Sequence, residues 1–207
     1  MLQILGRSTS INVRKVLWLC TELSLPYEQE LWGSGFKPTQ TPEFLALNPN
    51  ALVPVLRDGD FVLWESNTIC RYLAGKHGRT DLLPVEPAAR ARVEQWMDWM
   101  ATELNTSWRY AFLALVRKTP GYTDRAAIES SIASWNRHMA MLDAQLQRTG
   151  AYAAGAGFTL ADIMLGLATH RWYSTPMPRT ELSAVRAYYE RLSERPAFMQ
   201  HGRNGVP

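Results

Sequence analysis

The spacing of hydrophobic and polar positions changes along the chain, and its first part predicts a strand, a helix and a second strand. Leu2 to Leu5 is a short apolar run, and apolar residues recur at helical spacing from Val13 to Leu23. Pro26 ends this helix, and the run from Tyr27 to Leu31 is typical of another strand. Two strands joined by such a crossover lie parallel, with a right-handed connection.

The following segment predicts a β-hairpin that leads directly into a helix. Two β-rich runs flank Asp58-Gly59, a dipeptide that supplies the positive φ angles of a two-residue turn. The second run ends at Glu65-Ser66, and apolar spacing then predicts a helix to about Lys76. A short helix is also expected from Pro42 to Leu47. The order β-α-β, short helix, β-β-α predicts a small mixed four-stranded sheet, the thioredoxin-like arrangement.

The strand pattern disappears after a linker that is rich in glycine and proline, from Gly75 to Pro87. We therefore expect an α/β domain over residues 1–78 and an all-α domain over residues 88–207. The second domain should contain five helices, at Ala88 to about Lys118, Asp124 to about Arg148, from Thr159 onward, Glu181 to about Glu194, and a short one from Pro196.

The helix that starts at Thr159 has the strongest start signal in the chain. Asp162 can reach back to Thr159 as in a capping box, and Phe158 and Ile163 are placed for a hydrophobic staple. The nearly unbroken apolar run that follows, Ile163 to Ala168, predicts a helix that is buried on most sides.

Composition excludes several classes of protein. The 207 residues carry a net charge of +3 without a basic tract, which argues against a nucleic-acid partner. No apolar run is long enough for a membrane span, and the N-terminal apolar stretch is too short for a signal peptide. Cys20 and Cys70 fall on apolar faces of predicted helices, so we expect buried free thiols and a cytoplasmic, reducing location.

Glu65 and Ser66 suit the charged backbone end of an amino acid. A helix start leaves backbone N–H groups unpaired and carries partial positive charge, so Ser66 favours a carboxylate. The Glu65 carboxylate beside it could accept an ammonium group. The alternative is that Ser66 only caps the helix and Glu65 is a solvated strand end. If the Val53-Pro54 bond is cis, the Val53 backbone faces outward and can pair with an extended ligand.

Other site chemistries lack their motifs. The four histidines, His77, His138, His170 and His201, have no ligand spacing, so no metal site is expected. No phosphate-binding or dinucleotide-binding glycine pattern and no nucleophile-elbow serine occurs. A Cys-x-x-Cys motif is absent too, and hydroxyl side chains occupy the loop where a redox thiol would lie.

Four local motifs stand in the order found in one family. They are the Ser10-to-Val16 loop–helix junction, the Asn48-to-Val55 run with its Val-Pro step, the Glu65-Ser66 pair, and the Phe158-to-Asp162 box. Over its whole length the chain resembles a cytosolic glutathione transferase, and most closely bacterial proteins related to the theta and phi classes. The resemblance implies a cis Val53-Pro54 bond, a homodimer, and glutathione as co-substrate.

The resemblance also implies a glutathione site. The γ-glutamyl carboxylate would bind Ser66, the ammonium would bind Glu65, and the backbone at Leu52 and Val53 would pair with the cysteinyl segment. The nearest candidate for the glycine carboxylate is Lys37, which could also be only a solvated loop charge.

Ser10 is the expected donor to the glutathione sulfur, because it lies four residues before Arg14, where theta- and phi-like members carry their serine. Thr9 is the second candidate, and Asn12 could assist or substitute through its amide. The alternative is that all three residues only cap the helix. The loop contains no cysteine, which argues against mixed-disulfide thiol transfer.

The expected activity is attack of the glutathione thiolate on a small hydrophobic electrophile, or reduction of organic hydroperoxides. Isomerisation or dehalogenation would use the same thiolate. The alternative is a non-catalytic ligand carrier or a stress-response interaction protein, because a fold does not determine function. The electrophile pocket should lie between the domains, and its candidate residues, of which one or two are expected to line it, are Trp96, Met100, Trp108, Phe112 and Trp172.

Overall fold

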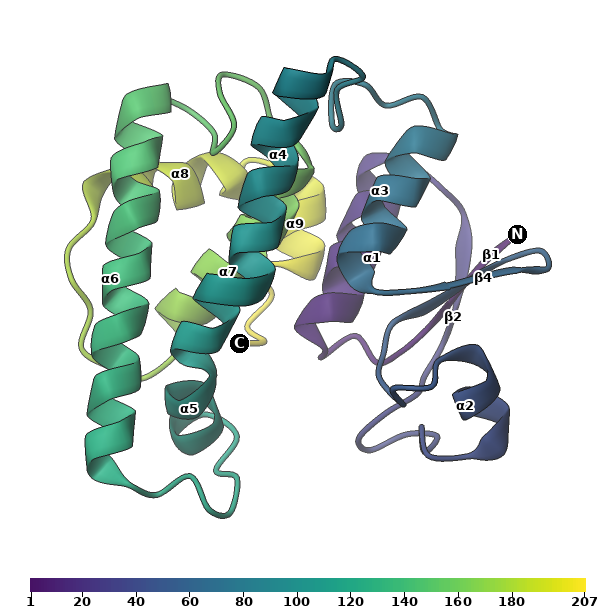
Figure 1. The fold of residues 1–207 in the computed structure, drawn as a ribbon, viewed down its shortest axis with the longest axis horizontal. Helices are drawn as coiled ribbons and strands as arrows, with labels where there is room; N and C mark the ends of the chain where they lie inside the picture. The colour runs from purple at the N-terminus through teal and green to yellow at the C-terminus, as the bar shows by residue number, and fades with distance from the viewer.

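The computed structural model describes residues 1–207, and its first part is a four-stranded sheet (Figure 1). The strands, in the spatial order β2-β1-β3-β4, are β1 (Leu2–Leu5), β2 (Tyr27–Glu30), β3 (Val55–Asp58) and β4 (Phe61–Trp64). β1 and β2 pair in parallel and are connected through α1 (Ile11–Glu22), whereas β3 runs antiparallel to both β1 and β4. The predicted mixed, thioredoxin-like sheet is confirmed.

The hairpin turn lies one residue later than predicted. Asp58 pairs with Phe61, so the two loop residues are Gly59 and Asp60 rather than Asp58 and Gly59. Of the two, only Gly59 has a positive φ, at 61°. A glycine at the first loop position is the requirement of a type II′ hairpin, so this glycine does direct the turn, but from a different position.

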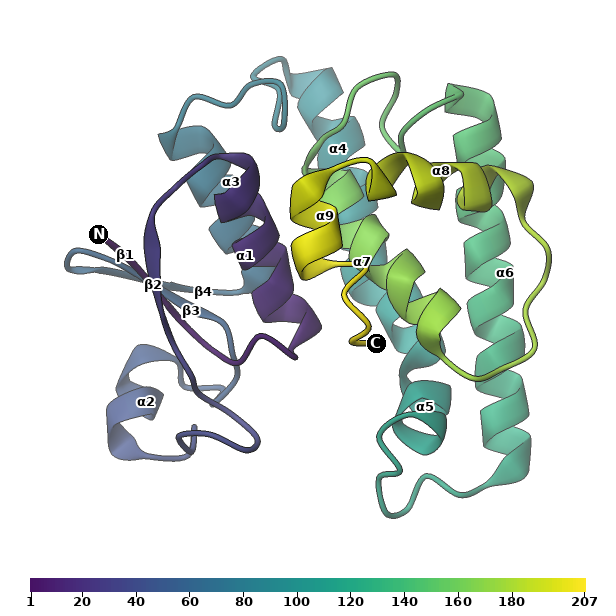
Figure 2. The ribbon, with the colours of Figure 1, turned by 180° about the vertical axis from the view of Figure 1, so that it is seen from behind.

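The two faces of the sheet are covered by different helices. Alternate side chains of a strand point to opposite faces, so Ile4 and Leu56 pack with α1 and α3 (Ser66–Lys76), while Leu5 and Val55 pack with Phe44 of α2 (Pro42–Leu47). In Figures 1 and 2, α1 and α3 lie between the sheet and the helical domain, and α2 lies on the far side of the sheet. The sheet therefore presents the start of α1 and of α3 toward the second domain.

The second domain is helical, as predicted. Its helices are α4 (Pro87–Trp99), α5 (Asn105–Leu115), α6 (Arg125–Thr149), α7 (Leu160–Ser174), α8 (Ser183–Ser193) and α9 (Pro196–His201). The prediction of a single helix from Ala88 to Lys118 was wrong in detail, because a π-helical segment, η1 (Met100–Leu104), separates α4 from α5. Within it the Thr102 hydroxyl donates to the Asp98 carbonyl at 3.0 Å, a contact that competes with the regular helix bond.

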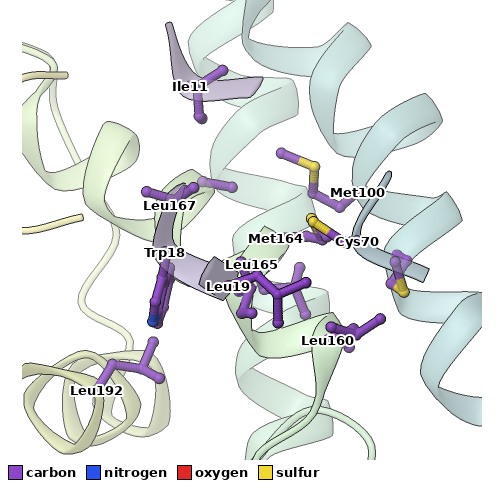
Figure 3. Close-up of a cluster of buried hydrophobic side chains, with 14 of the residues drawn as sticks. Ile11, Trp18, Leu19, Cys70, Met100, Leu160, Met164, Leu165, Leu167 and Leu192 are labelled. Carbon is purple, nitrogen blue, oxygen red and sulfur yellow. The ribbon is translucent and has the colours of Figure 1, made fainter. Parts of the chain in front are cut away.

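Helix α7 forms the centre of the structure. Thirteen of its residues, Leu160 to Trp172, are buried, and Asp162 accepts a hydrogen bond from the Thr159 N–H at 2.8 Å, so the predicted buried helix and its start signal are confirmed. At Gly166 an added Cβ would lie 2.8 Å from Leu192 and 2.9 Å from Trp18. Figure 3 shows these two side chains close together beside α7, with Cys70 and Met164 in the same cluster.

One hydrophobic core continues across both domains. Its buried side chains come from the sheet, from α1 and α3, and from every helix of the second domain. Leu82 and Leu83 of the predicted linker are buried in it, and the Leu160 N–H donates to the Leu82 carbonyl at 3.0 Å. The segment that joins the domains is thus packed against them. Both cysteines are free and buried, as predicted.

No helix of the structure combines the length and the apolar character that a bilayer crossing requires.

Candidate active site

The loop between β1 and α1 places Ser10 at the N-cap of α1. Its backbone is extended, with φ −83° and ψ 124°, and its carbonyl accepts the first helix bond from the Arg14 N–H at 3.0 Å. The Ser10 side chain makes no capping hydrogen bond. The hydroxyl is therefore uncommitted, and it lies in the wall of a cavity of about 240 Å³, which we call the peptide cavity.

The other two hydroxyl-loop candidates are placed differently. Thr9 is exposed, accepts a hydrogen bond from Arg7 at 3.2 Å, and lines none of the described cavities. Asn12 is exposed on the first turn of α1 and lines the peptide cavity together with Ser10. Of the three side chains, Ser10 and Asn12 therefore share a cavity with the strand edge and the α3 start.

The strand edge in this cavity has a free backbone. The Val53-Pro54 bond is cis, as the resemblance implies, and the N–H and carbonyl of Val53 have no hydrogen-bond partner in the protein. The neighbouring Leu52 carbonyl is occupied by the Asn48 amide at 2.7 Å. Gly6 allows this approach, because an added Cβ there would lie 3.0 Å from the Val53 Cβ. Val53 thus offers one donor and one acceptor to an extended ligand.

Glu65 and Ser66 also line the peptide cavity. Glu65 is the N-cap of α3, with a φ of +73° that is unusual for a residue with a side chain, and its carboxylate makes no capping bond. Ser66 is the first helical residue rather than the cap, and its side chain is buried. A strained backbone between a strand and a helix start is typical of sites where a side chain is held for function.

Lys15 is a buried cation beneath this helix start, and sequence reasoning did not identify it. Its ammonium donates to the Ser66 hydroxyl at 3.4 Å and to the Asn67 side-chain oxygen at 3.1 Å. Burial lowers the pKa of Lys15 to about 8; the Arg171 guanidinium lowers it further, and the Glu65 carboxylate opposes this. A positive charge and a helix N-terminus together favour a carboxylate at Ser66. No local signal separated Lys15 from the neighbouring Arg14 or from a solvated lysine.

The expected partner of the glycine carboxylate lies elsewhere on the surface. Lys37 pairs with Glu30, lies 5.2 Å from the centroid of the Trp32 ring, and lines none of the described cavities. The cation that lines the peptide cavity is Arg7, whose sequence position in the loop did not distinguish it.

A second and larger cavity, about 540 Å³ in volume, lies between the domains and is called here the acceptor pocket. Trp108 and Phe112 of α5 line it, so two of the five aromatic and methionine candidates are placed there. Met100 and Trp172 are buried in the core, and Trp96 packs against Trp99 with ring centroids 5.0 Å apart.

Ser10 lies in both the peptide cavity and the acceptor pocket, as do Arg7, Asn12 and Leu52. A group held at Ser10 would therefore face a second ligand in the acceptor pocket. This geometry suits a reaction between two bound molecules, one anchored by its charges along Val53 and Ser66 and one held against aromatic rings.

Comparisons with known proteins agree with this geometry. The N-terminal domain of glutathione S-transferases matches residues 9–76, and the C-terminal domain matches residues 125–191. The chain is 40% identical to glutathione S-transferase GstB of Escherichia coli over 95% of both chains, and 34% identical to glutathione S-transferase 3 of Zea mays over 96% of this chain and 92% of that one.

A solved structure is similar over the same extent. It is a theta class glutathione S-transferase from Xanthomonas axonopodis pv. citri with glutathione bound, 39% identical, with a TM-score of 0.89 over 97% of this chain and 96% of that chain. The chain therefore belongs to the glutathione S-transferase family.

Proposed function

We propose that this glutathione transferase holds glutathione in the peptide cavity and that the Ser10 hydroxyl donates a hydrogen bond to the glutathione thiolate. The observation that carries the proposal is the uncommitted Ser10 hydroxyl, in one cavity with the free Val53 backbone and the α3 start. The similar structure that contains glutathione supports the choice of ligand.

Each charged or polar part of glutathione has a matching group in the cavity. The γ-glutamyl carboxylate binds the Ser66 hydroxyl at the α3 start, above the Lys15 ammonium, and Glu65 accepts the γ-glutamyl ammonium. The cysteinyl segment pairs with Val53 beside Leu52, as a peptide pairs with a strand edge. For the glycine carboxylate, Arg7 is better placed than Lys37, because only Arg7 lines the cavity.

Ser10 favours the anionic form of the glutathione thiol. A free thiol has a pKa of roughly 8.5, so most of it is protonated at neutral pH. A hydroxyl donor and the positive end of α1 both stabilise the thiolate. Lowering the thiol pKa by about two corresponds to about 2.7 kcal/mol, which one strong hydrogen bond and a helix terminus can supply.

The thiolate then attacks the molecule in the acceptor pocket. In conjugation, a sulfur electron pair forms the new bond to carbon, the leaving group departs with its bonding electrons, and the thiol proton goes to solvent. In hydroperoxide reduction, two glutathione molecules give a disulfide, an alcohol and water. The aromatic wall of the pocket, at Trp108 and Phe112, supports a small hydrophobic electrophile, and the role that follows is detoxification.

Replacing Ser10 by alanine tests the proposal, with Thr9→Ala as the matched control. We expect Ser10→Ala to abolish the ultraviolet thiolate absorbance of bound glutathione. It should lower the turnover of 1-chloro-2,4-dinitrobenzene about tenfold or more, because it removes the hydrogen bond to the thiolate and leaves the helix terminus in place. Thr9→Ala should retain both. Loss of the thiolate signal in Thr9→Ala alone would assign the sulfur to the neighbouring hydroxyl, and its loss only in Asn12→Ala would assign it to the amide.

The alternative function is a non-catalytic glutathione-binding carrier or interaction protein. It predicts glutathione binding without turnover of aryl halides, epoxides, isothiocyanates or hydroperoxides, and no spectral effect of Ser10→Ala. The free Ser10 hydroxyl favours the enzyme, because a carrier has no use for an uncommitted donor beside the sulfur.

We also propose a cytoplasmic homodimer. Two free, buried cysteines fit a reducing compartment. The edge strand β4 exposes Phe61 and Trp64, an apolar surface that a second copy could cover. Sedimentation of the purified chain, compared with Phe61→Glu, measures this: a native protein that sediments as a monomer would contradict it.

A further inference from the structure

The acceptor pocket is lined by positively charged side chains and by no acidic side chain. Arg7, Arg109, Arg117 and Arg171 line it, and no aspartate or glutamate does. None of these four arginines forms an ion pair with an aspartate or glutamate side chain, whereas seven other arginines of the chain do. A cavity lined by one sign of charge attracts a ligand of the opposite sign.

Arg171 is the most informative of the four, because it is buried. Only 2% of the Arg171 surface is exposed, and its guanidinium carbon lies 4.5 Å from the Trp108 ring centroid and 4.1 Å from the Phe112 ring centroid. Its one side-chain hydrogen bond is a 3.4 Å contact from Nη2 to the main-chain oxygen of Pro207, the last residue of the sequence, to which Arg14 also donates at 3.1 Å. The buried Nε of Arg171 has no partner. Burial, together with the charges of Arg14 and Arg117, lowers the pKa of Arg171 well below its ordinary value. A buried guanidinium N–H without an acceptor is destabilising, and a ligand in the pocket can supply that acceptor.

The wall of the pocket suits a molecule with an apolar body. Trp108 contributes a ring and an indole N–H that is buried without a partner, and Ile11, Leu52 and Leu113 add apolar surface. The volume of about 540 Å³ is that of a small-molecule site. Aromatic rings beside unpaired donors fit a flat molecule that carries an acid group.

The carboxylates of glutathione itself do not account for these arginines. In the binding mode proposed above, Ser66 with Lys15 holds one carboxylate and Arg7 holds the other. Arg109, Arg117 and Arg171 line the acceptor pocket and not the peptide cavity. Three of the four cations are therefore left for the second substrate.

We propose that the electrophile of this transferase is an aromatic molecule with an anionic group, such as a carboxylate, and that Arg109, Arg117 and Arg171 bind that group. The inference rests on the proposed function, since it names the second substrate of the same reaction. For an aryl chloride, the thiolate forms a C–S bond at the carbon that carries chlorine. Chloride leaves with the electron pair of the C–Cl bond, and the thiol proton goes to solvent.

Two substrates that differ in one charge test the inference. 4-Chloro-3,5-dinitrobenzoate and 4-chloro-3,5-dinitrobenzamide share the ring and the leaving group. Their kcat/KM values are divided by their uncatalysed rates with glutathione to remove the difference in intrinsic reactivity. We expect the corrected value for the benzoate to exceed that for the amide about tenfold or more, as one charge-assisted hydrogen bond implies, and the ratio to fall in high salt.

Two double variants then test whether the arginines of the pocket cause the preference for the benzoate. Arg109→Gln/Arg117→Gln should lower the corrected kcat/KM for the benzoate about tenfold and that for the amide less than threefold. Arg92→Gln/Arg137→Gln removes the same charge from exposed positions on α4 and α6 outside the pocket, and it should leave the ratio unchanged. An equal effect of the two double variants would overturn the inference, because net charge alone would then explain the preference.

Binding of the product conjugates provides a second measurement that does not need turnover. Titration calorimetry with the two S-aryl glutathione products should show about tenfold tighter binding of the carboxylate conjugate. Equal affinities, or equal corrected rates for the two substrates, would sink the inference and leave the transferase function standing. Glutathione binding without turnover of any electrophile, and without a spectral effect of Ser10→Ala, would instead remove the proposed function, so the two outcomes are distinguishable.

Discussion

Replacement of Lys15 by methionine should stabilise the free protein and weaken its binding of glutathione. Methionine has a similar length, so it removes the charge with little change in packing. At pH 7 the native Lys15 is charged while fully buried, because its pKa of about 8 remains above the pH. The charge is therefore kept at the expense of folding stability, beside the helix start that is proposed to bind the γ-glutamyl carboxylate.

The effect on stability follows from the pKa. A fall from 10.5 to about 8 corresponds to about 3 kcal/mol of destabilisation below pH 8. The variant leaves two acceptors, on Ser66 and Asn67, without their lysine donor, at about 1 kcal/mol each, so the net gain at pH 7 is about 1 kcal/mol. Between pH 8 and 10.5 the unfolded chain holds a proton at Lys15 that the folded chain has lost, so native stability rises with pH there.

The effect on binding follows from distance. The Lys15 ammonium lies 3.4 Å from the Ser66 hydroxyl. A carboxylate oxygen on that hydroxyl would lie within about 6 Å of the ammonium, where an effective dielectric constant near 20 gives about 2 to 3 kcal/mol. Loss of the charge should therefore weaken glutathione binding about 30- to 150-fold.

Urea unfolding and calorimetry with glutathione measure both effects, with Lys76→Met as the control. Lys76 is exposed at the far end of α3, where it pairs with Asp58. We expect the difference in free energy of unfolding between Lys15→Met and the native protein to fall by about 2 kcal/mol from pH 7 to pH 9.5. The variant should therefore be about 1 kcal/mol more stable at pH 7 and about 1 kcal/mol less stable at pH 9.5. A Lys15→Met protein with native glutathione affinity, or one whose stability relative to the native protein does not change over this pH range, would refute the reasoning.

Three further predictions concern the site and the core. Arg7→Gln should raise the KM for glutathione about tenfold, because Arg7 is the cation of the peptide cavity, whereas Lys37→Met should leave the KM unchanged. If steady-state kinetics show the reverse, Lys37 and not Arg7 binds the glycine carboxylate. Gly166→Ala should destabilise the protein by about 1 to 3 kcal/mol, since the added Cβ would lie 2.8 Å from a leucine methyl of α8 and 2.9 Å from a tryptophan ring of α1; an unchanged urea midpoint would contradict this. Cys20 and Cys70 should react with a disulfide reagent only on unfolding, because burial raises the pKa of the Cys20 thiol to about 12 and raises that of Cys70 as well; rapid labelling of the native protein at pH 8 would show that these thiols are accessible.

The periodicity of the chain predicted the fold class because both domains are built from local patterns. Helices with one apolar face and a strand–helix–strand start need no long-range information. The errors arose where a local pattern is compatible with two geometries. Asp58-Gly59 signals a turn whether Asp58 or Gly59 is the first loop residue. The pairing of Asp58 with Phe61 decides for Gly59. The apolar spacing of α4 and α5 continues through the π-helical segment, so it does not reveal the interruption.

Of the candidate site, the sequence indicated those residues whose roles depend on a local element. Ser10 and Ser66 each stand at a helix start, and Val53 precedes a proline, so their chemistry is visible in a few residues. Lys15 and Arg171 were missed, because nothing local distinguishes a lysine or arginine that is buried from one that is solvated. Lys37 and Arg7 differ in the same way: both are loop cations, and only the folded chain shows which one lines the cavity.

The sequence alone determined the two kinds of domain, the helix starts and the hydroxyl loop, since hydrogen bonding and side-chain periodicity act between neighbours in the chain. The tertiary structure decided which charges are buried, which arginines lack a partner, and which side chains meet at Ser10. These properties depend on distances between segments far apart in sequence and on the loss of water around them, and both arise only when the two domains share one core.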